Sequence, residues 1–517
     1  MTRGTQEADT LPSQDRDEGL LDAWRLTPWW LRSLLLIASL GTFSIALRPM
    51  PRLLDYPFIE DAYYAFSVSR NLAVGNGLTI DGETWTNGFQ PLFTFLTSVA
   101  FLGSPPEEIS LRLIMIMQWG VLVATAMVVG LIVRTYTGGG NTRPLAFGVG
   151  FLAYIGSFYV INTSLNGLET GTLLLAYAVA WRYFQLHPPI NPKAAATLGV
   201  LLGVIALVRI DALVVIGVAL LGIWAIYGFT RAALAGAVTL FVVLPWLVYG
   251  MFLTGSPIPS SGRAQTLVEL SSFRAERVLD ALTSTGLPWL PITTLIPNYG
   301  TAVRGLLLAA LLIVFMLLRR QQRFAKMPRT EVFGMWLVVG VLALAGYYAI
   351  TSYAYWFYGR YLAPLALVAA VLVAAALLWL PRVFSIFASA ALTVTALAAS
   401  AGHWVTGLYQ ENTMFTAQVA LVERTVPASE TVSAAQTGTL GFFRAKTLNL
   451  DGKVNADILD FPGTADEYLK QANVMWMCDW PRLIEEYLGA GHPGWQEVDS
   501  QDEYLCVRRN PSSSSAQ

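Results

Sequence analysis

Two adjacent carboxylates, Glu60 and Asp61, are the residues of this sequence best suited to acid–base chemistry at a membrane boundary. They lie shortly after the first long apolar segment of a chain whose 517 residues are 55% hydrophobic and 13% charged. An ionised side chain at the centre of a membrane span costs about 3 kcal/mol, so a carboxylate pair near a span needs an explanation. At the mouth of a membrane cavity, one carboxylate could take a proton from a hydroxyl nucleophile. The alternative is a structural pair that starts a helix over 62–73, with Asp61 as its N-cap.

A third carboxylate, Glu169, follows the stretch Asn166-Gly-Leu at the start of another apolar segment. It could act with Asp61 in catalysis, or it could simply be a favourable charge in the first turn of a helix. Arg209 and Asp211 lie between two apolar segments that are only two residues apart. This spacing predicts an ion pair that joins two helix ends.

Two arginines are candidates for binding a phosphate group. Arg360 lies in the aromatic run 353–361, which also contains Tyr358, and Arg263 lies in the polar loop 254–300. A guanidinium group is always charged and binds phosphate in a bidentate way, and the loop could cover such a site. The alternative for Arg360 is an anchor that extends its charge from an aromatic belt to the interface.

The residues that follow the carboxylate pair have two interpretations. Tyr63 and Tyr64 are typical of interfacial anchors, and their rings could also stack on a sugar. Arg70 could pair with Asp61 or Glu60, or it could be solvated.

Long apolar segments define the elements that must position these side chains. A span needs roughly 20 apolar residues, and this criterion predicts an all-α polytopic membrane protein with about eleven transmembrane helices. The predicted spans are 31–47, 109–133, 145–162, 169–185, 194–208, 212–229, 232–253, 302–318, 332–350, 361–380 and 383–400. The segment 91–102 within the polar loop 50–107 is too short to cross and suits an interfacial helix.

Charge distribution predicts the orientation of these spans. Residues 1–30 are predicted to form a disordered cytoplasmic tail, because they are polar and acidic and lack the features of a signal peptide. With the tail inside and 91–102 not crossing, the basic residues from Arg134 and Arg143 to the cluster 319–329 lie on the cytoplasmic side. The loops that carry Asp61, Glu169, Arg209, Arg263 and Arg360 then share the extracytoplasmic side. The membrane domain spans 31–400 in this interpretation.

Composition changes after residue 400. Residues 401–510 contain many charges and short apolar runs separated by turn residues, which predicts a small extracytoplasmic α/β domain before a polar tail at 511–517. This region holds both cysteines, Cys478 and Cys506, which could form a disulfide or remain buried thiols. The three histidines are scattered, and no metal-binding motif or basic face for nucleic acid is evident.

Several short motifs, in order, resemble the GT-C superfamily of membrane glycosyltransferases. The first loop is similar to the bacterial branch that carries Asp-Asp-Ala-Tyr-Tyr and Thr-Asn-Gly-Tyr-x-Pro-Leu motifs. That branch includes protein O-mannosyltransferases, lipid A aminoarabinose transferases and actinobacterial arabinofuranosyltransferases. The matching stretches are Glu60-Asp61-Ala-Tyr-Tyr, Arg70-Asn-Leu-Ala-x-Gly75-x-Gly77, Asp81-Gly82, Thr86-Asn87-Gly88-Phe89-Gln90-Pro91-Leu92, Asn166-Gly-Leu-Glu169, Leu207-Val-Arg209-x-Asp211, Gly359-Arg360-Tyr361-x-x-Pro364, Gln436-x-Gly438-x-Leu-Gly441 and Asn449-Leu-Asp451-Gly452-x-Val-Asn455.

The resemblance implies a GT-C fold in the plasma membrane and a polyprenyl-phosphate-linked sugar donor. The acceptor would be a hydroxyl of a cell-envelope glycan, lipid or protein on the extracytoplasmic face. Arabinofuranose and mannose are both sugars that the resemblance suggests. The hydroxyl would attack the anomeric carbon with inversion, through a transition state of oxocarbenium character.

The resemblance also implies roles for individual residues. Asp61, Glu60 and Glu169 would be catalytic, although Glu60 stands where the family motif usually begins with Asp, and Asp61 is the favoured base. The implied substrate-binding residues are Arg360, Arg263, Tyr63, Tyr64, Arg70, Asn87, Gln90, Arg209 and Tyr358. Some members use a divalent cation, so Mg2+ or Mn2+ on Glu60, Asp61 and Glu169 is an open alternative to a metal-free site.

Two other classes of function compete with a transferase. A proton-coupled secondary transporter would use the carboxylates as proton or ion sites, but such proteins often show inverted repeats and mid-membrane sites, and neither is evident here. A non-catalytic scaffold or lipid-binding protein would act mainly through residues 401–510.

Overall fold

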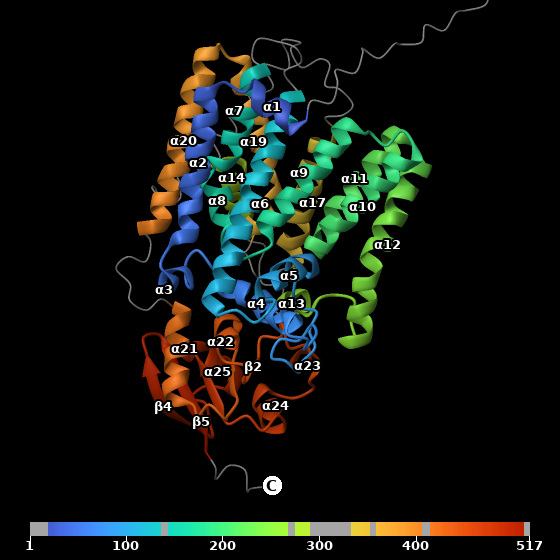
Figure 1. Ribbon diagram of the computed structural model, residues 1–517. Helices are drawn as coiled ribbons and strands as arrows, with labels where there is room; N and C mark the ends of the chain where they lie inside the picture. The colour runs from blue at the N-terminus through green and yellow to red at the C-terminus, as the bar shows by residue number, and fades with distance from the viewer. Residues whose placement is uncertain are drawn as a thin grey trace, which may run out of the picture.

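The structure is a computed structural model that describes residues 19–135, 143–266, 275–289, 332–351, 358–405 and 414–510. The predicted span at 302–318 lies outside these residues. Helices make up the larger part of the molecule, and a small sheet domain lies at one end (Figure 1).

The first half of the described chain is entirely helical apart from short connections. Its helices are α1 (Leu20–Leu26), α2 (Trp29–Phe43, extended by a 3-10 turn over Ser44–Leu47), α3 (Met50–Leu53), α4 (Glu60–Ala73), α5 (Pro91–Ser98, extended over Val99–Phe101), α6 (Glu107–Thr135), α7 (Arg143–Ile155), α8 (Phe158–Ser164), α9 (Thr170–Leu186), α10 (Pro192–Val208), a 3-10 turn (Ile210–Ala212), α11 (Leu213–Tyr227) and α12 (Phe229–Leu253). The remaining helices before the sheet domain are α13 (Ser260–Thr266), α14 (Ala275–Gly286), α17 (Val332–Thr351), α18 (Tyr358–Tyr361), α19 (Pro364–Trp379) and α20 (Arg382–Val405).

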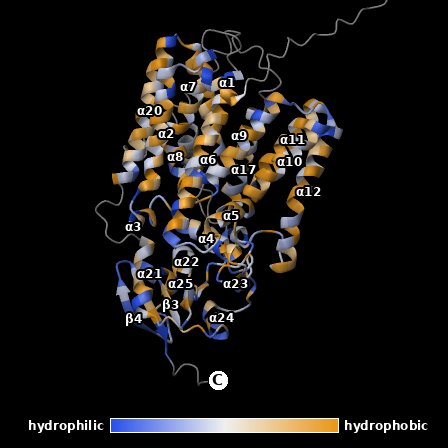
Figure 2. Ribbon diagram, viewed as in Figure 1, coloured by the Kyte–Doolittle hydropathy of each residue, from blue (hydrophilic) through white to orange (hydrophobic). Residues whose placement is uncertain are grey.

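Among the described residues, six helices are long and apolar enough to cross a membrane, and a bent pair formed by α7 and α8 would make a seventh. The helices α10 and α19 are apolar but shorter, at 17 and 16 residues. The prediction of a polytopic helical membrane protein is therefore confirmed, while the number of eleven spans stays a prediction. Hydrophobic residues cover these helices, and hydrophilic residues are more frequent in the sheet domain (Figure 2).

Small residues allow the membrane helices to approach closely. Gly199 and Gly203 of α10 face α12, and a Cβ atom at Gly199 would lie 2.5 Å from the carbonyl oxygen of Ala235. A Cβ atom at Gly203 would lie 2.6 Å from Cβ of Val242. Glycines four residues apart are typical of helix packing in lipid, where van der Waals contact replaces the hydrophobic effect as the attraction between helices.

The loop between the long helices α2 and α6 contains α3, α4 and α5, and of these α4 and α5 lie beside the sheet domain (Figure 1). α4 begins at Glu60, and its N-cap is Ile59, which makes no side-chain cap bond. The structural interpretation of Asp61 as an N-cap is therefore wrong, because Asp61 already lies inside the first turn. α5 begins with Pro91 at a position that tolerates proline. The hydroxyl of Ser69 on α4 lies 3.0 Å from the carbonyl oxygen of Thr94, which can accept its hydrogen bond, and 2.7 Å from the hydroxyl of Thr97, where either oxygen can donate; these contacts fix α5 against α4.

The C-terminal domain contains a five-stranded mixed sheet, as the sequence predicted for this region. Its strands are β1 (Val432–Ala434), β2 (Thr447–Asn449), β3 (Trp476–Asp479), β4 (Trp495–Gln501) and β5 (Tyr504–Arg509), in the order β2-β1-β3-β5-β4. β1 pairs in parallel with β2 and β3, and β5 is antiparallel to β3 and β4. The helices of this domain are α21 (Met414–Thr425), α22 (Gly438–Phe443), α23 (Asp457–Asp460), α24 (Ala465–Gln471) and α25 (Pro481–Leu488).

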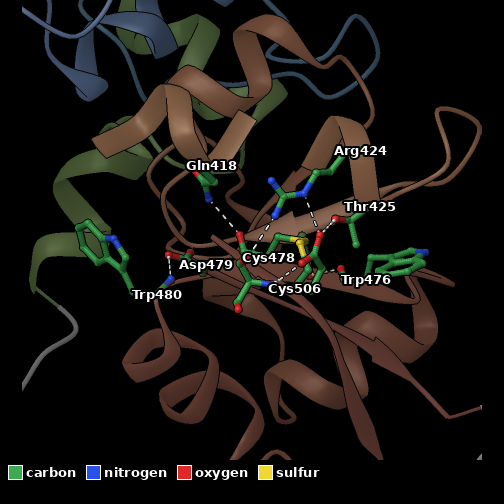
Figure 3. Close-up of a disulfide and its surroundings, with 11 residues drawn as sticks. Gln418, Arg424, Thr425, Trp476, Cys478, Asp479, Trp480 and Cys506 are labelled. Atoms are coloured by element: carbon green, nitrogen blue, oxygen red, sulfur yellow. Dashed lines mark hydrogen bonds and ion pairs between the residues drawn. A yellow bond between two sulfur atoms is a disulfide. The ribbon is translucent and has the colours of Figure 1, made fainter. Parts of the chain in front are cut away.

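The two cysteines form a disulfide in this domain (Figure 3). Cys478 of β3 and Cys506 of β5 are directly opposite each other in the antiparallel ladder, with their Cα atoms 4.1 Å apart. Of the two alternatives left by the sequence, the disulfide is therefore the one the structure confirms.

The sheet domain contacts the membrane domain through α22 and α4. The ring of Phe442 lies 5.4 Å from that of Tyr63 and 6.4 Å from that of Phe66, and all three side chains are buried. Since α4 also carries Glu60 and Asp61, this contact places the carboxylate pair between the two domains.

Candidate active site

A cavity of about 370 Å3 opens between the membrane helices and the C-terminal domain. Residues from eight separate stretches of the chain line it. The polar and aromatic lining residues are Asp61, Tyr64, Gln90, Glu169, Arg209, Asp211, Ser261, Arg263, Gln265, Tyr347, Tyr348, Thr351, Arg360, Tyr361 and Lys453. The other lining residues include Gly88, Phe89, Leu168, Val214 and Pro259. Several of the predicted site residues, from distant segments, thus meet at one place, whereas Glu60, Tyr63, Arg70 and Asn87 are not part of the lining.

Asp61 lies between two cations that come from different domains. Its Oδ2 accepts a hydrogen bond from Nη1 of Arg360 at 3.1 Å, and its Oδ1 lies 3.5 Å from Nζ of Lys453. Burial would raise the pKa of this carboxyl group, but the positive charges of Lys453 and Arg360 outweigh burial and hold the pKa below its usual range. Asp61 is therefore ionised at neutral pH and faces the cavity.

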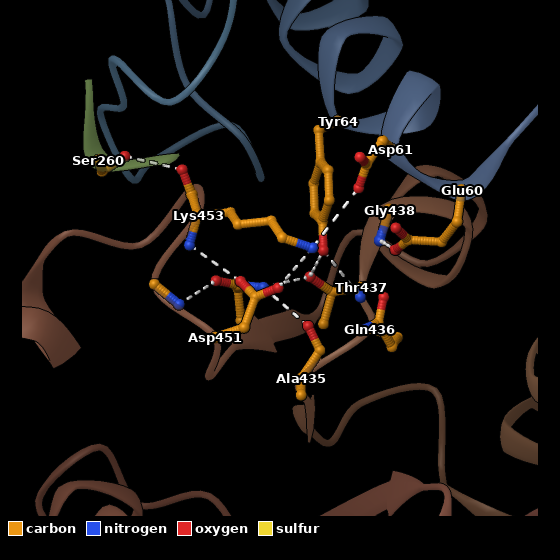
Figure 4. A network of polar contacts seen from close by, with 12 residues as sticks. Glu60, Asp61, Tyr64, Ser260, Ala435, Gln436, Thr437, Gly438, Asp451 and Lys453 are labelled. Carbon is orange, nitrogen blue, oxygen red and sulfur yellow. Dashed lines mark hydrogen bonds and ion pairs between the residues drawn. The ribbon is translucent and has the colours of Figure 1, made fainter. Parts of the chain in front are cut away.

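Glu60 points away from the cavity toward the C-terminal domain (Figure 4). Its Oε1 accepts a hydrogen bond from the backbone N–H of Gly438, at the start of α22. Burial raises the pKa of Glu60 to about 8, and the neighbouring charge of Asp61 adds to the rise. The adjacent carboxylates therefore have different environments, one in the cavity and one in the domain contact.

Arg209 and its ion-pair partners Asp211 and Glu169 form another part of the cavity lining. The chain leaves α10 at Arg209 and enters a 3-10 turn, which turns the guanidinium toward both Asp211 and Glu169. Its Nη2 lies 2.6 Å from Oδ2 of Asp211, so the predicted ion pair is confirmed. Its Nη1 lies 2.5 Å from Oε1 of Glu169, which connects this pair to the start of α9. The hydroxyl of Tyr348 donates to Asp211 at 2.7 Å and completes this part of the lining.

Arg263, on α13, lines the cavity from the side of the C-terminal domain. Its guanidinium contacts both carboxylate oxygens of Asp460, at 2.5 and 3.3 Å. Arg263 and Arg360 both line the cavity, and their binding of a phosphate stays a prediction. The structure does not describe the side chain of Tyr358, so its predicted role stays a prediction.

The two predicted polar residues of the Asn87–Gln90 stretch have different places. Gln90 lines the cavity, and its buried Oε1 has no hydrogen-bond partner among the described residues. An unsatisfied buried acceptor is costly unless a ligand or water fills the site. Asn87 lies behind the wall, where its side chain accepts from the backbone N–H of Ser260 at 2.9 Å and donates to the carbonyl of Ser256 at 3.0 Å. Asn87 therefore holds the α13 loop rather than the cavity contents.

Two further predicted binding residues lie away from the cavity. Tyr63 is fully buried among the aromatic residues between α4 and α22, and its hydroxyl donates to the carbonyl of Leu54. Arg70 forms an ion pair with Glu107 at 2.7 Å and lies over the ring of Phe442. The predicted pairing of Arg70 with Asp61 or Glu60 is wrong, because Arg70 lies near the C-terminal end of α4, about two and a half turns beyond Asp61. Tyr64, by contrast, lines the cavity.

Sequence reasoning missed Lys453 and the aromatic pair Tyr348 and Tyr361, whose rings stack at 4.1 Å beside Arg209. Lys453 occupies the variable position of the Asn449-to-Asn455 motif. The only signal was its place next to Asp451 and Gly452 in a motif already linked to the first loop by the resemblance.

The alternative of a divalent cation on Glu60, Asp61 and Glu169 does not fit the geometry. Glu60 binds the backbone of Gly438, Asp61 contacts two cations, and Glu169 contacts Arg209. Within the described part of the chain, no group of three or more His, Cys, Asp or Glu side chains could hold a metal ion. The cations beside Asp61 would repel a second positive charge at that point.

Comparison of the structure with solved structures finds several matches of similar architecture, and three of them are described here. ArnT from Cupriavidus metallidurans bound to undecaprenyl phosphate superposes with a TM-score of 0.61 at 13% sequence identity, over 94% of this chain and 99% of that one. The same protein in the apo state gives 0.56 at 14% identity and the same coverage. The apo oligosaccharyltransferase from Archaeoglobus fulgidus gives 0.53 at 14% identity, over 88% of this chain and 70% of that one.

These neighbours are GT-C members, so the chain has the GT-C fold that its motifs implied. The match covers the membrane helices and the C-terminal domain together, since it extends over nearly the whole chain. A scan of protein-family models found no match, and a comparison with curated protein sequences found none either.

Proposed function

We propose that this protein is a membrane glycosyltransferase that moves a sugar from a polyprenyl-phosphate donor to an acceptor hydroxyl. The contact between Asp61 and Arg360 carries this proposal. It brings a carboxylate from the first loop and a guanidinium from the segment before α19 together across 299 residues, inside one cavity. A base and a phosphate-binding cation are the two groups that such a transfer requires.

In the proposed reaction, Asp61 takes the proton of the acceptor hydroxyl. The hydroxyl oxygen bonds to the anomeric carbon as the bond from that carbon to the phosphate oxygen breaks. Polyprenyl phosphate leaves as an anion beside Arg360, whose fixed charge stabilises it. The charges of Lys453 and Arg360 lower the pKa of Asp61 and keep its carboxyl group ionised, which is the form that can accept a proton. Attack from the side opposite the phosphate would invert the anomeric configuration.

The position of the cavity supports an extracytoplasmic reaction. It lies at the end of the membrane domain that faces the C-terminal domain. The connection between α9 and α10 lies at the opposite end. At that end Gln185 is hydrogen-bonded to Thr135, and Arg231 is hydrogen-bonded to Ile190. The basic residues of that opposite end favour a cytoplasmic location. We therefore propose a plasma-membrane protein whose active site faces outward and whose acceptor is a cell-envelope glycan, lipid or protein.

The fold supports the kind of donor. The neighbour ArnT was solved with undecaprenyl phosphate bound, and the cavity of this chain lies where its own cations and carboxylates converge at the membrane boundary. Arabinofuranose and mannose are the sugars we propose to test first, because the sequence motifs resemble families that transfer them.

Transfer of labelled sugar from polyprenyl-phosphate-linked arabinofuranose and mannose to cell-envelope material tests this proposal. We expect Asp61→Asn to lower the rate about 100-fold or more, since general base catalysis contributes at least that factor. Asp499→Asn is the matched control. It removes the same kind of charge from an Asp–Arg pair at the surface of the C-terminal domain, and the rate should stay at the wild-type level.

An Asp61→Asn protein that transfers sugar at the wild-type rate would exclude Asp61 as the base. The competing transporter hypothesis makes a different prediction, namely flux of an unmodified substrate into proteoliposomes without covalent transfer. The position of Asp61 beside the C-terminal domain, rather than within a span, favours the transferase.

A further inference from the structure

Lys453 is the one charged residue that the C-terminal sheet domain, within the described part of the chain, contributes to the cavity lining. Its side chain is 15% exposed and extends from the loop after β2 toward α4. Its ammonium nitrogen lies 3.5 Å from Asp61, 3.0 Å from Asp451 and 5.8 Å from the ring centre of Tyr64 (Figure 4). The loop therefore places a positive charge of the C-terminal domain beside Asp61 of α4.

The backbone around Lys453 is held from both domains. Within the loop, Asp451 accepts from the N–H of Lys453 at 2.9 Å, and Gly452 has a φ of +78°, a conformation that favours glycine. From the membrane side, the hydroxyl of Ser260 donates to the carbonyl of Lys453 at 2.7 Å. A Cβ atom at Gly88 would lie 1.8 Å from that same carbonyl oxygen. The position of Lys453 is thus built by contacts that a loosely attached surface lysine would not have.

The cavity lining itself has one more cationic side chain than it has carboxylates, and Asp451 and Asp460, which lie outside the lining, contact Lys453 and Arg263. The lining contains four cationic side chains and three carboxylates among the described residues. Arg209 contacts two of those carboxylates, Glu169 and Asp211. The third, Asp61, is shared by Arg360 and Lys453, one on each of its oxygens. One phosphate group beside this carboxylate could therefore reach both cations.

The ammonium group of Lys453 also has hydrogen-bonding capacity left for a ligand. An ammonium has three N–H donors, and that of Lys453 makes one hydrogen bond, to Asp61, and an ion pair with Asp451, so these contacts engage at most two of them. One donor therefore remains for a ligand. The contact to Asp61 is also long, so the ammonium can turn toward a phosphate oxygen without losing its closer partner, Asp451.

We propose that Lys453 binds the phosphate of the lipid-linked donor, so that the C-terminal domain supplies part of the donor site. This inference rests on the proposed function. With Arg360, Lys453 holds the phosphate from two sides, and it stabilises the negative charge that remains on the phosphate when the anomeric bond breaks. The C-terminal domain is then a component of the active site as well as a cover over it.

Binding of undecaprenyl phosphate to the full-length protein in detergent, measured by native mass spectrometry, tests this inference. Undecaprenol, which lacks the phosphate, is measured in parallel. We expect Lys453→Met, which keeps the length of the side chain but removes its charge, to weaken binding of the phosphate lipid about tenfold or more. Binding of undecaprenol should not change. Lys446→Met is the matched control, because Lys446 is an exposed lysine of the same domain bonded to the carbonyl of Ser429.

Each outcome bears on one of the two proposals. If the wild-type protein does not bind undecaprenyl phosphate, the proposed donor is wrong and this inference fails with it. If the wild type binds and Lys453→Met binds equally well, or loses both lipids equally, only the inference about Lys453 fails. Lys453→Gln, which retains a hydrogen-bonding end, carries the same comparison if Lys453→Met does not fold.

Discussion

At the scale of single residues, the adjacent carboxylates Glu60 and Asp61 have different environments although they are neighbours in α4. Successive residues of α4 point about 100° apart, so Asp61 enters the cavity while Glu60 meets the backbone of Gly438. Arg360 and Lys453 favour the charged form of Asp61, whereas burial favours the neutral form of Glu60. The same side-chain chemistry is therefore suited to proton acceptance at one position and to domain contact at the next.

The raised pKa of Glu60 predicts a pH dependence of stability. The folded protein retains the proton of Glu60 up to a pH of about 8, whereas the unfolded chain loses it near the ordinary value of 4.5. The native state therefore binds more protons in between, and stability falls as the pH rises from about 5 to 8. Even one unit of this rise corresponds to about 1.4 kcal/mol.

Glu60→Gln keeps an acceptor for the N–H of Gly438 and removes the titration. In thermal melts from pH 5 to 8, the melting temperature of the wild type should fall relative to that of Glu60→Gln. Glu485→Gln, at an exposed position of α25, should follow the wild type. Parallel curves for the wild type and Glu60→Gln would show that Glu60 does not hold a raised pKa.

Residue types and local spacing predicted some of the contacts in this site and missed others. Arg209 and Asp211 are two residues apart, so their ion pair could be predicted from the chain itself. The contact between Asp61 and Lys453 joins residues 392 positions apart, and no local pattern indicates it. For Arg70, nearness in sequence suggested a pairing with Asp61, but the geometry of α4 places the two side chains apart and Arg70 pairs with Glu107 instead.

At the scale of elements, the length of apolar segments predicted a polytopic helical protein, because the thickness of a bilayer fixes how long a span must be, and six or seven of the predicted spans are long apolar helices within the described residues. The same criterion separated α5, which is short and lies beside α4, from the spans. Helix starts were harder to predict. The start of α4 depends on contacts of Glu60 with the C-terminal domain, which lie outside the local sequence.

Gly88 of the first loop lies against the C-terminal domain with no room for a side chain, which predicts the effect of adding a single methyl group. In Gly88→Ala, the new Cβ atom would lie 1.8 Å from the carbonyl oxygen of Lys453, so the Lys453 loop must move. We expect a loss of stability of about 1–3 kcal/mol from overpacking. Binding of undecaprenyl phosphate should weaken about tenfold, because Lys453 is displaced with its backbone.

The matched control is Gly120→Ala in α6, where a Cβ atom would meet nothing within 4 Å. Melting temperature and lipid binding are measured for both variants. If Gly88→Ala retains wild-type stability and binding, then the loop around Lys453 is not fixed against Gly88 in the working protein.

At the scale of the whole molecule, the candidate active site lies where the C-terminal domain packs against the membrane domain. Hydropathy located the two domains but could not place one on the other, because their contact is made by a few buried side chains, such as Phe442 and Tyr63, in segments of mixed composition. Asp479 illustrates this dependence. It ends β3, and its carboxylate accepts from the N–H groups of Ala435 and Gln436, just before the Gly438 contact to Glu60.

The disulfide between Cys478 and Cys506 lies beside this connection, so its removal tests whether the sheet supports the active site. Closing a loop of 28 residues stabilises a domain by about 3 kcal/mol, chiefly by limiting the unfolded chain. We expect the double variant Cys478→Ala and Cys506→Ala to melt at a lower temperature than the wild type. Sugar transfer should be retained at low temperature and lost earlier on warming, because Asp479 then releases the segment that contacts Glu60.

A reductant should lower the melting temperature of the wild type but leave that of the double variant unchanged. If the double variant loses its sheet domain on warming but still transfers sugar at the wild-type rate, the C-terminal domain does not contribute to the active site.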